Sequence, residues 1–117
     1  MQLIISGKGL GLTDAIENYV AKKINPLEKF FKGIIRADVT LGKETKHRVK
    51  GEIFYAECKL AIPGNDIFER EGGKDLYSAI DGLKDGLEVE LKRRKAKLHK
   101  NDKKIHIARR SNKEYQD

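Results

Sequence analysis

Apolar and polar residues alternate along several segments of the chain, as half-buried strands require. The alternation predicts strands over residues 2–8 and 35–41, where apolar positions repeat every second residue. A longer strand is predicted over 49–62. Its apolar positions change phase midway, and a bulge near Gly51 would reconcile the two halves. Residues 67–71 complete the set as a short strand, expected at the edge of the sheet.

Apolar residues at helical spacing predict two helices, one over about residues 14–32 and one beginning near Asp75. The two apolar stripes are Ile16, Val20, Ile24, Leu27 and Phe31 in the first helix, and Leu76, Ile80, Leu83, Leu87 and Leu91 in the second. Pro26 lies inside the first. A proline in a helix interior costs about 3 kcal/mol, so we expect a kink or break near Asn25. Gly33 ends this helix.

The element order is therefore β-α-β-β-β-α, which is an α+β fold. A strand, a crossover helix and a second strand give one parallel pair, and two hairpins add antiparallel strands. We expect a four-stranded mixed sheet with both helices on one face and water on the other. The domain is predicted to cover residues 1–100. Residues 101–117 show no sustained periodicity and are predicted to be a basic, mobile tail.

The composition suits a single domain inside the cell. Of the 117 residues, 38% are hydrophobic, enough for a modest core. Cys58 is the single cysteine, so the chain has no internal disulfide and no zinc site built on paired cysteines. The N-terminus resembles no signal peptide, and no segment approaches the ~20 apolar residues of a membrane span. We expect a cytoplasmic protein without a membrane partner.

The net charge of +7 is concentrated at the C-terminal end. Residues 92–117 contain eleven Lys and Arg against three Asp and Glu, whereas residues 1–91 contain fourteen against fifteen. A basic element on a nearly neutral body indicates a polyanionic partner, either nucleic acid or an anionic membrane. The alternative is a solvated, lysine-rich helix end.

No catalytic or cofactor site emerges from the sequence. His47, His99 and His106 lack a serine or carboxylate at triad spacing and are predicted to be surface residues. Cys58 falls on the apolar face of a strand, which favours a core role over a nucleophile. The glycines of residues 7–11 lack the spacing of a phosphate-binding loop. We predict no enzyme, metal, cofactor or small-molecule substrate.

Basic residues off the apolar stripes of the two helices are the candidate binding residues. If both helices lie on one face of the sheet, these side chains can border a common surface that pairs with RNA phosphates. The alternative is that they are merely solvated. The candidates are Lys22, Lys23 and Lys29 on the first helix and Arg93, Lys97 and Lys100 on the second.

Several motifs, in order over residues 1–98, resemble the ribosome hibernation-promoting factors, also called ribosome-associated inhibitors or, in an older label, sigma-54 modulation proteins. The opening Met1–Lys8, the segment Leu12–Ile16 and the run Leu27–Lys29 match the family. Its most distinctive segment is matched by Asp75–Asp81. The resemblance implies a fold like that of double-stranded RNA-binding domains. It also implies binding to rRNA of the small ribosomal subunit in the mRNA and tRNA channel, with inhibition of translation.

The family's RNA contacts carry over only in part. Lys23, Lys29 and Arg93 match basic positions of the family, whereas Pro26, Gly86 and Val89 stand at positions that are usually basic. We expect Lys22, Lys97 and Lys100 to compensate. The chain resembles the short type of factor, monomeric when free, with a basic tail that adds affinity for rRNA. Two alternatives stay open, namely a general double-stranded RNA-binding module and a regulatory protein-interaction domain.

Overall fold

The computed structural model describes the backbone of residues 1–44 and 54–116, and the side chains of these residues as far as Leu98. Its elements are β1 (Gln2–Lys8), α1 (Asp14–Ile24), the 3₁₀ helix η1 (Asn25–Lys29), β2 (Arg36–Lys43), β3 (Phe54–Ala61), β4 (Ile67–Gly73) and α2 (Leu76–Gln116). The predicted order β-α-β-β-β-α is confirmed. The bulge predicted near Gly51 lies outside the described residues.

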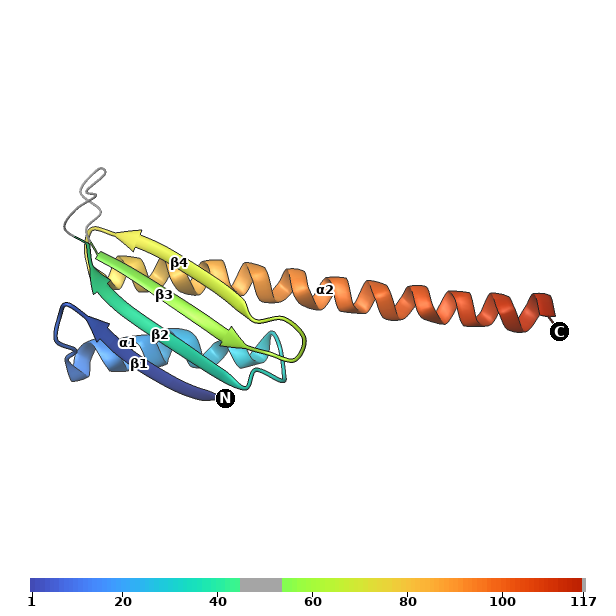
Figure 1. Cartoon of the computed structure of the whole chain (residues 1–117), viewed down its shortest axis with the longest axis horizontal. Coiled ribbons are helices and arrows are strands. Elements are labelled where there is room, and N and C mark those ends of the chain that lie inside the picture. The colour runs from blue at the N-terminus through green and yellow to red at the C-terminus, as the bar shows by residue number, and fades with distance from the viewer. Residues whose placement is uncertain (45–53, 117) are drawn as a thin grey trace.

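The four strands form one mixed sheet in the order β1-β2-β3-β4. β1 is parallel to β2, and the pairs β2–β3 and β3–β4 are antiparallel. The sheet, its topology and β4 as an edge strand are as predicted. Both helices cover the same face, with α1 behind β1 and β2 and α2 behind β3 and β4 (Figure 1). The candidate binding residues on the two helices therefore belong to one layer of the molecule.

Pro26 divides the first helical segment, as predicted. α1 ends at Ile24, and the chain continues as η1 from Asn25 to Lys29. Proline cannot donate the backbone hydrogen bond that an α-helix needs at this position, and it suits the start of the next turn. The predicted helical extent to residue 32 is too long. Helical structure stops at Lys29, and Gly33 turns the chain towards β2 with a φ of 120°.

The core lies between the sheet and the helices. Val20, Ile24 and Leu27 of the first stripe and Ile80, Leu83, Leu87 and Leu91 of the second are fully buried. Cys58 is also buried on this face, as predicted, and burial raises the pKa of its thiol to about 12. The core therefore fixes how α2 is rotated about its axis up to Leu91.

α2 begins one residue after Asp75 and is longer than predicted. The Ser78 N–H donates to Asp75 Oδ1 at 2.8 Å, so Asp75 caps the helix from the position before it. The helix projects beyond the sheet to Gln116 (Figure 1), through the segment predicted as a tail. No glycine or proline follows Gly86, and lysine, arginine and alanine favour helix without an apolar stripe. The division at residue 100 and the mobility of the tail stay predictions.

One side chain on the open face of the sheet is buried, which the alternation did not predict. Tyr55 is only 8% exposed, because its ring lies across Gly42 on the neighbouring strand, where any Cβ would clash with it. The guanidinium of Arg70 covers the ring at 4.0 Å from its centroid. Arg70 in turn pairs with Glu44 and Glu57. The charge of Arg70 is thus neutralised.

Candidate nucleic-acid interface

Lys23 lies in the seam between α1 and α2. Its Nζ is 3.5 Å from Asp81 Oδ1 and 5.4 Å from the centroid of the Tyr19 ring. The Tyr19 hydroxyl donates to the same carboxylate oxygen at 2.6 Å, and this hydrogen bond raises the pKa of Tyr19. Tyr19 also meets Tyr77 edge-on, with centroids 4.8 Å apart. Lys23 therefore helps to join the helices, and Lys22 beside it is exposed on α1.

Lys29 belongs to a hollow at the other end of the helical layer. Phe30 and Phe31 line it together with three exposed lysines, Lys29, Lys32 and Lys95. The Lys92 Nζ lies 4.8 Å from the centroid of the Phe30 ring. The end of η1 and the middle of α2 thus meet in a basic and aromatic cluster.

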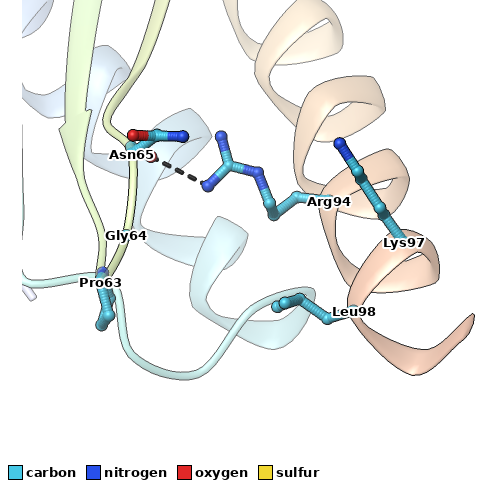
Figure 2. Close-up of a pocket in the computed structure, with 6 residues that line it drawn as sticks. All are labelled: Pro63, Gly64, Asn65, Arg94, Lys97 and Leu98. Carbon is cyan, nitrogen blue, oxygen red and sulfur yellow. Dashed lines mark hydrogen bonds between the residues drawn. The ribbon is translucent and has the colours of Figure 1, made fainter. Parts of the chain in front are cut away.

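A second hollow lies between α2 and the turn that joins β3 to β4. It is lined by Pro63, Gly64, Asn65, Arg94, Lys97 and Leu98 (Figure 2). Arg94 donates to the carbonyl oxygen of Asn65 at 2.9 Å, which fixes the helix to the turn. The side chain of Arg94 extends from α2 towards the turn, and the side chain of Lys97 lies along the helix beside it (Figure 2).

The five predicted residues whose side chains are described do not share one hollow. Lys23 lies in the helix seam, whereas Lys29 and Lys97 lie in two different hollows. Arg93 pairs with Glu90 at 2.7 Å. The Lys100 side chain lies outside the described ones. The role of the six in RNA binding stays a prediction.

Four cations that sequence analysis did not select complete the basic end of the domain, namely Lys32, Lys92, Arg94 and Lys95. We call the set of Lys29, Lys32, Lys92, Arg93, Arg94, Lys95 and Lys97 the basic collar, since it surrounds α2 where the helix leaves the sheet. Five of its members fall within residues 92–97. This basic run could have been recognised in the sequence as part of a binding surface. The sequence does not show that η1 lies beside it.

The segment of α2 before the collar is acidic by contrast. Between residues 81 and 90 it has four Asp and Glu and one lysine, Lys84, which pairs with Glu88 at 2.8 Å. Gly86 leaves the space that the Glu69 carboxylate of β4 occupies. Desolvation, with the charges of Glu71 and Glu90, raises the pKa of Glu69. This segment of α2 therefore carries net negative charge, unlike the collar.

In the described part of the chain no three His, Cys, Asp or Glu side chains come together as metal ligands. Over the same residues, no helix has the length and apolar character needed to cross a bilayer.

Residues 3–99 match the model of the family described as sigma 54 modulation protein / S30EA ribosomal protein. The chain belongs to this family. The resemblance inferred from the sequence motifs is thereby confirmed.

Curated relatives in the family are named ribosome hibernation promoting factor. The one from Klebsiella oxytoca is 35% identical over 98 residues, which is 84% of this chain and 97% of the relative. That of Escherichia coli K12 is 34% identical over the same shares. The Azotobacter vinelandii relative is 36% identical over 97 residues, 83% of this chain and 85% of its own.

Solved structures agree with the fold. The Thermus thermophilus Protein Y N-terminal domain superposes with a TM-score of 0.67 at 35% identity, over 80% of this chain and 98% of that domain. A ribosomal subunit interface protein from Coxiella burnetii gives a TM-score of 0.71 at 21% identity, over 82% of this chain and 99% of that protein. At that identity the second likeness concerns the fold alone.

Proposed function

We propose that this chain is a ribosome hibernation factor. It binds rRNA of the small ribosomal subunit in the channel for mRNA and tRNA, and it thereby inhibits translation in the cytoplasm. Family membership and the shared name of the relatives support the assignment. The observation on this chain that carries it is the basic collar, which concentrates positive charge at one end of the helical layer.

The proposed mechanism is steric and electrostatic. Lysine and arginine side chains neutralise phosphates and release the counterions condensed on the RNA, which is favourable at low salt. The sheet and core hold the collar in one arrangement, so little order has to be gained on binding. A domain bound in the channel excludes mRNA and tRNA by volume. No bond needs to form or break.

Competition on purified small subunits tests the proposal. We expect the protein to sediment with free small subunits and to be displaced when mRNA and tRNA fill the channel. In a translating extract, an excess of the protein should stop synthesis. If it sediments equally with free and with filled subunits, the channel is not its site.

A charge variant tests the collar itself. Lys29→Gln, Lys95→Gln and Lys97→Gln together remove three exposed cations, and glutamine keeps the helix propensity of lysine. The matched control, with Lys8→Gln, Lys59→Gln and Lys74→Gln, removes the same charge from exposed sites elsewhere. We expect the collar variant alone to lose inhibition. Equal affinity of the wild-type protein for plain RNA duplexes and for subunits would instead favour a general RNA-binding module.

A further inference from the structure

The hollow beside η1 combines an apolar floor with a basic rim. Phe30 and Phe31 are half-buried, packed against the core on one side and lining the hollow on the other. Lys29, Lys32 and Lys95 stand around them. Lys29 and Lys32 are three positions apart, whereas Lys95 follows more than sixty positions later, so the cluster exists only in the folded protein.

The positive charge of this hollow is not neutralised from within the described part of the chain. Glu28, next to Lys29, is engaged by the amino terminus of Met1 at 3.0 Å. Glu88 is shared between Lys84 and Lys92. Lys29, Lys32 and Lys95 have no described carboxylate within ion-pairing distance, so their charges are available to an anion from outside the chain.

We propose that this hollow binds one unpaired nucleotide of an RNA strand, with the base against the Phe30 and Phe31 rings and the flanking phosphates on Lys29, Lys32 and Lys95. The proposal rests on the proposed function, and it specifies the RNA as unpaired at this point. Aromatic rings with lysines on a rim are how proteins hold single strands without reading sequence.

Other anions fit the hollow less well. A phosphate alone would use the lysines and bury none of the ring surface that remains exposed, so it would gain nothing from the hydrophobic effect. A paired duplex covers its base faces within its own stack, so only its phosphates could reach the rim. An unpaired nucleotide uses both the rings and the lysines.

The test compares three probes, namely oligouridine, a blunt RNA duplex and inorganic tripolyphosphate. The double variant Phe30→Leu and Phe31→Leu keeps the apolar contacts with the core and removes the aromatic faces. We expect it to weaken oligouridine binding by about fivefold or more, the effect of losing one stacked base, and to leave duplex binding unchanged. Phe68→Leu is the control, since Phe68 is 62% exposed on the opposite face of the sheet.

An NMR titration of the wild-type protein tests the site without any variant that could fail to fold. Oligouridine should shift the ring proton resonances of Phe30 and Phe31, and the resonances of Phe68 should not move. Two results overturn the proposal. One is oligouridine binding that the double variant Phe30→Leu and Phe31→Leu does not change. The other is a shift of the ring signals by tripolyphosphate as large as the shift by oligouridine.

Failure of this proposal can be told from failure of the proposed function. If the wild-type protein binds small subunits but oligouridine does not shift the Phe30 and Phe31 signals, only the proposal of a nucleotide site is wrong. If oligouridine shifts these signals but the protein does not sediment with small subunits, the nucleotide site is supported and the proposed ribosomal function is wrong.

Discussion

The salt dependence of RNA binding can be worked out from the ion pairs of the collar. Lys92 pairs with Glu88 and Arg93 with Glu90, and Arg94 is held by the Asn65 carbonyl. Lys29, Lys32, Lys95 and Lys97 have no ion pair to a described carboxylate. These four are therefore the cations most available to phosphates.

Each phosphate neutralised on a duplex contributes about −0.9 to the slope of log K against log salt concentration. Four such contacts contribute about −3.6, which is a roughly 150-fold fall in affinity between 50 and 200 mM salt. The collar variant retains Lys32 alone among the four. The collar should then contribute about −0.9, which is a loss of only about 3.5-fold over the same range.

Quantitative sedimentation with small subunits at a series of salt concentrations measures both slopes. The matched control variant carries the same net charge as the collar variant and should keep the wild-type slope. The reasoning is refuted if the collar variant and the control variant give the same slope, because charge at any position would then serve equally well.

Three further predictions concern single residues. Gly42→Ala places a Cβ against the Tyr55 ring and should lower the free energy of unfolding, measured in urea, by about 1–3 kcal/mol. Gly11→Ala is the control, because a Cβ there meets open space and should not change it. Equal effects of the two substitutions would contradict this packing. The pKa of Tyr19 is raised by its hydrogen bond to the α2 carboxylate, so this contribution to stability is present below the usual tyrosine pKa and lost as pH rises through the folded value. Tyr19→Phe should therefore lower the Tm at neutral pH, with a gap to wild type that closes in strong alkali; a gap independent of pH would contradict it. Burial raises the pKa of Cys58 to about 12, so iodoacetamide should alkylate it at pH 8 only in denaturant, and rapid labelling of the folded protein would show that the strand is open.

Most of the fold was predictable because local patterns agree with the tertiary structure. The stripes through Val20 and Leu83 are buried as their spacing predicts. Pro26 ends the α-helix because it cannot donate a backbone hydrogen bond to the preceding turn, and this effect is local in the sequence. The length of α2 was not predictable from apolar periodicity, since beyond Leu98 the helix depends on residue propensity alone.

The candidate site was predictable in type and only partly in position. Helical spacing shows that Lys23 and Arg93 lie off the apolar stripes, but it does not show what stands beside them. Lys23 meets Asp81, which lies 58 positions further along the chain, and the hollow at Lys29 depends on Lys95 of the other helix. Such contacts follow from how two helices are placed on a sheet, which the sequence of either helix does not encode.

The separation of charge along α2 has a kinetic consequence. The molecule is 66 Å long, and its excess positive charge is at the end of the chain where α2 projects. Such a molecule has a large electric dipole moment, and the field of a polyanion exerts a torque on it before contact. It should thus approach RNA with the projecting end of α2 foremost, which raises the fraction of encounters in a productive orientation. The association rate constant should therefore fall as salt is added.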